Sequence, residues 1–493
     1  MGGTQAAIGQ PRWVLTDRVP RELPRRAPGG VRHLWWVPAL VAACALAANA
    51  RDHGPDGPLV PWYAAALTLV AMTPAALRSL AVARGHQTRG PIPFMPLVGL
   101  CYAVYYALPV LATDAPTFMY RQVGAEHLER ATRIALTGVV ALLFGYYAVG
   151  RALRFGRRID LQWDPRRAVV ASLLALPFGL VLELSLRVVS FPPALARPID
   201  LLGQLLPLSI GALVLLARAG HLPRWVALVA WGVFAPAYSL LEASDGVIGS
   251  MVWSFSFFAM LRWGGGLRMP VALIAAAVPL IALMRVAGHE YRQMEGTRGA
   301  VTTGTVSDRV GAMLDQTRTV YEEQGVVTPM VLLLDRLGQI VLFAWVVERS
   351  PAPVPHWGAT TLSTLPATLI PRALWPNKPE KKVGYRFGRR YGVIEHDSKT
   401  TINLPQLVEW FVAYGSFGVL FGMTAIGAFY RRLDDLLNYH GASDANVLLA
   451  AAVLSPLLQI ESDSSMIFGG IMQTGVVLYV LMWLVKPRAG AAG

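Results

Sequence analysis

The sequence predicts an all-helical, polytopic membrane protein with about twelve transmembrane helices. Hydrophobic residues make up 54% of its 493 positions and charged residues only 15%, whereas a soluble domain has about 25% charged residues. Apolar stretches of roughly 17–25 residues recur, and each is long enough to cross ~30 Å of hydrocarbon. The net charge of +14 comes from Lys and Arg that lie mainly between these stretches, where membrane topology accounts for them without nucleic acid.

The expected spans fall into two groups on either side of one long connection. They are residues 34–50, 59–77, 92–112, 131–150, 168–186, 199–217, 225–242, 246–262, 270–287, 404–429, 445–461 and 465–485. The first nine spans form an N-terminal bundle (residues 1–287), and the last three form a C-terminal group (404–493). Residues 288–403 are too long to be a simple link between helices.

The Lys and Arg residues between the spans predict the orientation of the chain. With a cytoplasmic N-terminus, the inner segments carry 23 of them and the short outer loops carry six. An excess of positive charge in short connections marks the cytoplasmic side. We therefore expect both termini in the cytoplasm and the long connection outside it, since long loops translocate largely regardless of charge.

The long connection contains two stretches with helical patterns. Residues 305–322 carry apolar side chains at helical spacing, with charged residues off that face. Residues 329–347 are more apolar, but Asp335, Arg336 and Gln339 lie on nearly one face, which is costly in lipid. We expect a helix in the first stretch, and in the second an amphipathic or re-entrant helix that packs against the bundle.

One part of the connection, Leu369 to Tyr391, is strongly basic and reads LIPRALWPNKPEKKVGYRFGRRY. Arg grips phosphate with two hydrogen bonds, Lys adds compact charge, and aromatic faces suit sugar rings. The alternative is a solvated basic loop that meets anionic lipid headgroups. The candidate binding residues are Arg372, Trp375, Lys378, Lys381, Tyr385 and Arg386, together with His396 beyond the basic run.

Acidic residues gather at the expected outer ends of the spans. Ionisable groups near membrane depth are costly unless something compensates, so they are functional candidates. Glu409 lies about one turn into the apolar stretch LPQLVEWFVAYGSFG, and Glu461 and Asp463 lie at the end of the next span. Outer helix ends also tolerate charge, and Glu183 with Arg187 is expected to be a structural i,i+4 pair.

Sequence motifs of soluble enzymes are absent. The chain has no P-loop, no GxSxG elbow, no HExxH, no zinc spacing and no nucleotide-binding fingerprint. Its two cysteines, Cys44 and Cys101, lie inside apolar stretches, so neither a disulfide framework nor a metal site is expected. We expect chemistry without metal or nucleotide, on a substrate that already carries the energy for the reaction.

Three segments resemble the bacterial O-antigen and oligosaccharide-repeat-unit polymerases of the Wzy type. They are DRLGQ, IPRALWPNKP and LPQLVEWFVAYGSFGVLFG, within roughly Asp335 to Gly422. The resemblance implies a multispan membrane glycosyltransferase of the GT-C-like class, related to the O-antigen ligases and located in the bacterial inner membrane. It also implies that Arg336 and Arg372 grip the pyrophosphate of an undecaprenyl-linked glycan, with Lys378 assisting.

The implied reaction extends a surface polysaccharide at the outer face of the cytoplasmic membrane. Donor and acceptor are undecaprenyl-diphosphate-linked glycans, and Arg336 and Arg372 stabilise the charge that grows on the donor's pyrophosphate. Glu409, or failing that Glu461 or His396, accepts the proton of the acceptor hydroxyl. A single displacement inverts the anomeric configuration.

Partners and alternatives follow from the same resemblance. A chain-length regulator and a repeat-unit flippase are expected partners, besides the bilayer itself. One alternative is a ligase that transfers finished glycan to another acceptor. The other is a transporter or flippase for lipid-linked glycan, a class that usually carries repeats and helices broken at mid-membrane.

Overall fold

The computed structural model describes residues 40–44, 47, 59–86, 90–112, 123–153, 158–189, 191–243, 248–266, 282, 306–325, 329, 333, 337–360, 363, 375, 383–394 and 401–487. Over these residues all regular secondary structure is helical, without a strand. The predicted all-helical fold class is therefore confirmed.

Six helices of the described chain are long and apolar enough to cross a membrane, which makes this a membrane protein. They are Val60–Ala83, Ala125–Ala152, Pro165–Val188, Pro198–Arg218, Gln406–Leu437 and Ser464–Val485. Two shorter apolar helices cover Phe94–Val110 and Asp444–Leu458. Ten of the twelve predicted spans coincide with helices, and the other two, 34–50 and 270–287, lie mainly outside the described residues. Twelve crossings remain a prediction.

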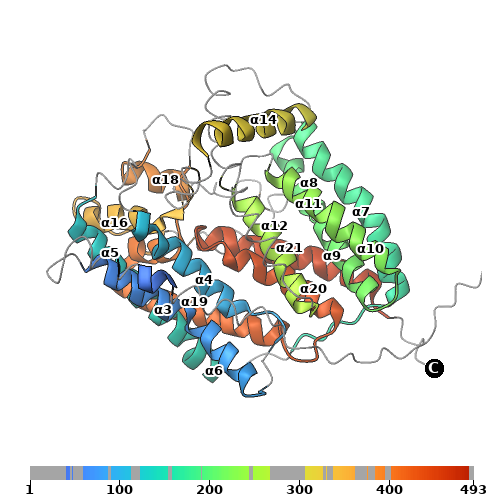
Figure 1. Cartoon of the computed structure of the whole chain (residues 1–493), viewed down its shortest axis with the longest axis horizontal. Coiled ribbons are helices and arrows are strands. Elements are labelled where there is room, and N and C mark those ends of the chain that lie inside the picture. Colours follow the sequence, from blue (N-terminus) through green and yellow to red (C-terminus); the bar gives the residue numbers. More distant parts are fainter. Residues whose placement is uncertain are drawn as a thin grey trace, which may run out of the picture.

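In one half of the bundle, α5 and its continuation pack against α19, and α3 packs against both α5 and α4 (Figure 1). Its elements are α3 (Val60–Ala83), α4 (Phe94–Tyr106), η1 (Leu108–Ala112), α5 (Ala125–Phe144), η3 (Gly145–Val149), α6 (Gly150–Ala152) and α19 (Gln406–Leu437). A Cβ on Gly145 would lie within 2.5 Å of the carbonyl oxygen of Thr424, and one on Gly427 would lie as close to that of Leu142. Glycines thus let the backbones of α5 and α19 touch, as small residues do between membrane helices.

The other half is built around α9, with α7 on its outside. Its elements are α7 (Pro165–Val188), α8 (Pro193–Gly203), α9 (Leu205–Arg218), α10 (Arg224–Val229), η4 (Ala230–Phe234), α11 (Ala235–Ala243) and α12 (Ile248–Gly264). Asp164 starts α7 by accepting hydrogen bonds from the backbone N–H groups of Arg166 (2.9 Å) and Arg167 (3.2 Å). Only 17% of the apolar window of α7 is buried, against 72% for Pro198–Arg218, so α7 faces the surroundings and α9 the core.

The C-terminal helices join the two halves. They are α20 (Asp444–Leu454), η7 (Ser455–Leu458) and α21 (Ser464–Val485). α20 packs against α9, α12 and α19, and α21 packs against α7 and α8. Because α20 and η7 are buried along their length, they form the centre of the bundle.

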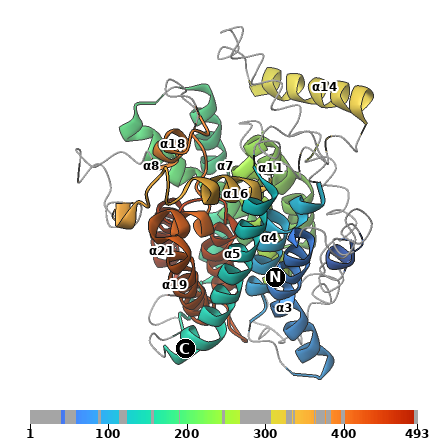
Figure 2. The same cartoon turned by 90° about the vertical axis from the view of Figure 1, so that its left-hand side faces the viewer.

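Four elements of the long connection are described. They are α14 (Val306–Gln324), α16 (Gln339–Arg349), η5 (Gly358–Thr360) and α18 (Val383–Arg390). α14 confirms the helix predicted at 305–322, and α16 packs against α5 as predicted for the more apolar stretch. Both views place α14, α16 and α18 toward the same end of the bundle, with α14 standing apart (Figures 1 and 2).

α19 departs from the continuous span predicted at 404–429. It breaks at Gly415, where φ is 64° and ψ is −150°, a conformation open only to glycine. The break leaves a short arm (residues 406–413) and a long arm (residues 416–437).

The short arm folds back along the long arm. A Cβ on Gly422 would lie within 2.5 Å of the Trp410 ring, whereas a straight helix would hold these residues ~18 Å apart. A Cβ on Gly138 of α5 would meet Leu407 at 3.0 Å and Val419 at 2.9 Å, which pairs one residue of each arm. The chain therefore runs along the short arm to the break at Gly415, reverses its direction there, and continues along the long arm beside the short arm.

Candidate functional site

The candidate site is a polar segment that lies buried in an apolar bundle. We call residues 459–465, which run from the end of η7 into the first two residues of α21, the polar connection; it reads QIESDSS. Its five residues from Glu461 to Ser465 are each between 1% and 8% exposed. Burying polar groups is costly unless they are bonded, so this segment stands out as a functional candidate.

Glu409 of the short arm joins the polar connection. Its side chain is 1% exposed, and its Oε2 accepts hydrogen bonds from the backbone N–H (2.8 Å) and the hydroxyl (2.7 Å) of Ser464. The backbone N–H of Gln406 donates to the carbonyl oxygen of Ile460 at 3.1 Å. The short arm is therefore docked on the polar connection by its backbone and by its one acid.

Asp463 lies at the same helix end. It precedes the first residue of α21, and its Oδ1 accepts from the backbone N–H of Met466 (3.1 Å) and from the hydroxyl of Ser465 (2.5 Å). The positive end of a helix dipole attracts anions, but here Asp463 and Glu409 already occupy it. A substrate phosphate is therefore not expected at the start of α21.

Three predicted site residues thus meet in space. Glu409, Glu461 and Asp463 come from two spans that are separate in the sequence, and the fold brings them to one buried segment. Hydrogen bonds also connect this region to the long arm. There the hydroxyl of Tyr430 donates to Gln406 Oε1 (3.1 Å) and to the carbonyl oxygen of Leu457 (3.3 Å).

The basic stretch contributes α18, which the sequence did not predict as a helix. Its apolar residues Val383 and Phe387 are buried, and so is Tyr391 just beyond it. The Tyr391 hydroxyl lies 2.7 Å from that of Ser350, and burial raises the pKa of this tyrosine. The Trp345 indole donates to the carbonyl oxygen of Tyr391 at 2.8 Å, so α18 is fixed to the end of α16.

The arginines of α18 differ in what they contact. The Arg389 guanidinium lies over the Tyr385 ring, 3.8 Å from its centroid. Arg390 lies over Trp357 (5.4 Å) and donates to the carbonyl oxygen of Pro355 (2.9 Å). Arg386 and Arg390 are both exposed and open to an anionic ligand, although Arg390 already donates to Pro355. The face of Tyr385 already holds a cation.

α18 lies close to the short arm. A Cβ on Gly384 would lie within 2.5 Å of the carbonyl oxygen of Ile402, and one on Gly388 would meet the Ile402 side chain at 3.2 Å. Gln406 begins the short arm four residues later, a reach of at most ~14 Å. The exposed basic helix and the buried acids therefore belong to one region.

A short segment also bridges α18 and the short arm, and the sequence did not single it out. The backbone N–H of Trp357 donates to the carbonyl oxygen of Val412 at 2.9 Å, and its ring lies edge-on to Phe387 (6.5 Å). The neighbouring His356 ring lies edge-on to Phe411 (5.7 Å). In the sequence, the segment is distinguished only by the prolines close to His356 and Trp357. This is a weak signal for a functional residue.

The remaining predicted residues are placed as follows. Trp375 is 37% exposed. Arg336, Arg372, Lys378, Lys381 and His396 lie outside the described residues. Within the described residues, no three His, Cys, Asp or Glu side chains lie close enough together to hold a metal ion.

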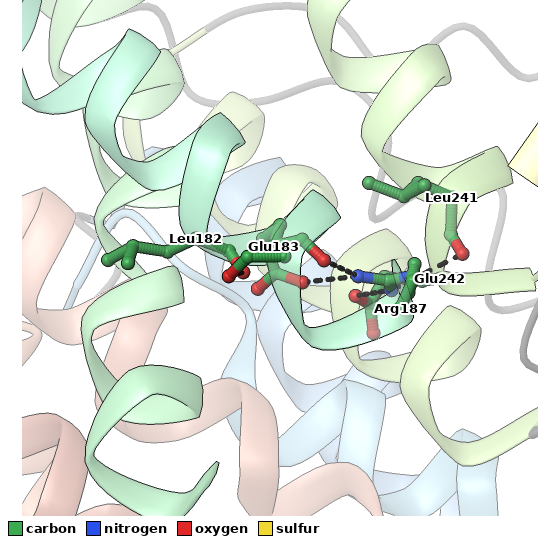
Figure 3. A network of polar contacts seen from close by, with 6 residues as sticks. Leu182, Glu183, Arg187, Leu241 and Glu242 are labelled. Carbon is green, nitrogen blue, oxygen red and sulfur yellow. Dashed lines mark hydrogen bonds and ion pairs between the residues drawn. The ribbon is translucent and has the colours of Figure 1, made fainter. Parts of the chain in front are cut away.

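A second polar network ties α7 to α11 (Figure 3). Arg187 contacts Glu183 Oε2 at 2.6 Å, which confirms the predicted pair, and it also contacts Glu242 Oε1 at 3.0 Å. It donates further to the carbonyl oxygens of Glu183 (2.8 Å) and Leu241 (3.3 Å). The three charged side chains are at most 14% exposed. The network is therefore a buried ion-pair cluster that holds the ends of two helices together.

Comparison with known proteins assigns no activity to this region. Residues 271–436 match the model of a family described as a domain of unknown function (DUF8712). The matched part contains the basic stretch and Glu409 and ends before the polar connection. No curated protein and no solved structure matches the chain.

Proposed function

We propose that the protein is a membrane glycosyltransferase that polymerises undecaprenyl-diphosphate-linked oligosaccharide units into a surface polysaccharide. The observation that carries this proposal is the docking of Glu409 on the buried polar connection, close to the basic helix α18. Such a site offers separate places for a diphosphate and for a proton acceptor. We place the reaction at the outer face of a bacterial inner membrane.

The basic stretch suits the diphosphate of the donor. The start of α21 is taken by two carboxylates, so an anionic group is left to Arg and Lys. Arg386 is exposed on α18, and Arg372 and Lys378 precede it in the same stretch, with Arg336 upstream. These cations would stabilise the negative charge that develops on the leaving diphosphate.

The buried acids suit the acceptor. As the bond between the anomeric carbon and the diphosphate breaks, the acceptor hydroxyl attacks and passes its proton to a carboxylate. Glu409 is our first candidate for this base, because Ser464 holds its side chain in one position. Glu461, on the same polar connection, is the second. The products are a longer glycan on one lipid and free undecaprenyl diphosphate.

One observation favours a second candidate function, a carrier for lipid-linked glycan. In many transporters the substrate site is formed by discontinuous helices. α19 is also discontinuous, with its break at Gly415. A carrier would move the lipid-linked unit across the bilayer without changing its length.

Purified protein in liposomes separates the two functions. Undecaprenyl-diphosphate-linked repeat units are supplied without nucleotide, and the glycan length and free undecaprenyl diphosphate are measured. A polymerase gives a ladder of longer glycans with release of undecaprenyl diphosphate. Units that cross the bilayer at unchanged length would instead establish the carrier and overturn the proposal.

A further inference from the structure

Three hydroxyl groups in the centre of the protein point to a small ligand that the glycan chemistry does not require. They belong to Tyr102 and Tyr106 of α4 and to Ser455 at the start of η7. Each residue is 0% exposed, and none of the three hydroxyls has a hydrogen-bond partner among the described residues. Buried hydroxyls without partners are costly, so a bound polar species would be stabilised beside them.

The three hydroxyls lie in one region. The rings of Tyr102 and Tyr106 stack with centroids 5.8 Å apart. Tyr102 interacts electrostatically with Tyr430, whose hydroxyl donates to Leu457 of η7 at 3.3 Å. α4 packs directly against η7, the short helix that begins with Ser455.

An acid faces this region from the polar connection. The carboxylate of Glu461 interacts electrostatically with the hydroxyl of Tyr106 and with the thiol of Cys101. The titratable groups on the elements around it include Cys101, Tyr102, Tyr105 and Tyr106 of α4, Tyr430 of the long arm, Glu409 of the short arm and Asp463 of the polar connection itself. Glu461 therefore adds a carboxylate to a set of oxygen donors.

The charges around these donors favour a cation. The chain of α20 and η7 ends at Leu458, and the carbonyl end of a helix is the negative end of its dipole. The positive end of α21 faces Glu409 and Asp463, which already occupy it. Hydroxyl, carboxylate and carbonyl oxygens are the donors that alkali cations use at such helix ends.

We propose that Glu461, Tyr106 and Ser455 form a binding site for a small monovalent cation, either sodium or a proton carried by the carboxylate. This site is separate from the diphosphate-binding stretch and does not depend on glycan transfer. Occupation would fix the polar connection, on which the short arm with Glu409 is docked.

Thermal unfolding of the purified full-length protein tests for sodium. Sodium is titrated against choline at constant pH and ionic strength, with no glycan present. Ligands that bind only the folded state raise its stability, so the apparent Tm should rise by several degrees and then saturate.

Glu461→Gln should abolish the rise in Tm. Ser455→Ala is a small change that should leave the fold intact and weaken the rise. The matched control for Tyr106→Phe is Tyr391→Phe, which removes a hydroxyl that contacts Ser350. This control should keep the full rise in Tm.

Carbodiimide labelling tests for a proton, because carbodiimides modify protonated carboxyl groups in apolar surroundings. Labelling of Glu461 that increases as the pH falls and is unaffected by sodium identifies the proton. Protection by sodium but not by choline identifies sodium. The proposal is overturned if sodium leaves Tm unchanged and Glu461 is not labelled at any pH, or if Tyr106→Phe and Ser455→Ala both respond as wild type does. Because glycan length is measured separately, neither result depends on polymerase activity.

Discussion

An alanine at Gly422 would place a methyl group where the Trp410 ring now lies. Its Cβ would come within 2.5 Å of three ring atoms of Trp410, whereas carbon atoms prefer ~3.5–4.0 Å. The short arm therefore has to move by about 1 Å or more. Overpacking of this kind costs about 1–3 kcal/mol, and Glu409 on the same arm would shift relative to Ser464. A misplacement of ~1 Å in a reacting group can lower activity by about 10²-fold.

Gly475→Ala is the matched control, since a Cβ there meets nothing within 4 Å. Both variants gain the same ~1 kcal/mol of helix propensity, so the difference between them isolates the clash. Thermal unfolding in detergent and glycan length after reaction are the two measurements. Gly422→Ala should unfold several degrees below Gly475→Ala and make little polymer.

A double variant identifies the partner of the added methyl group. In a Trp410→Leu background, Gly422→Ala should cost much less, with a coupling energy of about 0.5–3 kcal/mol. If Gly422→Ala is as stable and active as Gly475→Ala, or if its effect is the same with and without Trp410, then the two arms of α19 do not pack as described.

Three further predictions concern charge. Arg372→Lys keeps the charge but loses the two-pronged grip on a diphosphate, so polymer amount should fall well beyond the effect of a neutral change elsewhere. Arg187→Met leaves two buried acids without their cation and should destabilise the protein by about 3–5 kcal/mol, measured by thermal unfolding. Reporter fusions at Arg158 and Gly441 should report the cytoplasm and one at Lys382 the outside, as the bias of 23 to six positive residues indicates.

Each of these has its own control. Lys486→Gln at the far end of α21 should leave polymer formation unchanged, and near-normal polymer from Arg372→Lys would make Arg372 only a solvated charge. Arg318→Met breaks an exposed pair with Glu322 and should change stability by less than about 1 kcal/mol. If Arg187→Met has only the same small effect, the ion pairs of Arg187 do not stabilise the fold as buried ion pairs do. A cytoplasmic signal at Lys382 would overturn the mechanism, because the basic stretch would then face the wrong side.

Helix positions could be predicted from the sequence because length and apolarity determine where a chain can cross a membrane. The same reasoning placed Glu409, Glu461 and Asp463 at helix ends on one side. It could not show that all three meet at the start of α21, because that depends on contacts between distant segments. The role of Asp463 as the residue that caps α21 was not predicted either, although Asp is a favoured residue at the N-terminal cap of a helix.

The break in α19 could not be predicted because residues 404–429 form an almost uninterrupted apolar run. In a continuous helix, Gly415, Gly418 and Gly422 would share one side, a pattern that predicts close approach of another helix. The close approach is real for Gly418 and Gly422, but the partner is the chain's own short arm. Gly415 lies at the turn itself, with a positive φ that no spacing rule reveals.

The role of Glu409 is tested most directly by Glu409→Gln in the nucleotide-free polymerisation assay. Glutamine is nearly isosteric and can still accept hydrogen bonds from Ser464, so the short arm should stay docked while proton acceptance is lost. Because a positioned general base contributes about 10²–10⁴-fold, the variant should bind undecaprenyl-diphosphate-linked units yet make almost no polymer, whereas wild type gives a ladder. A full ladder from Glu409→Gln would contradict this role and transfer it to Glu461.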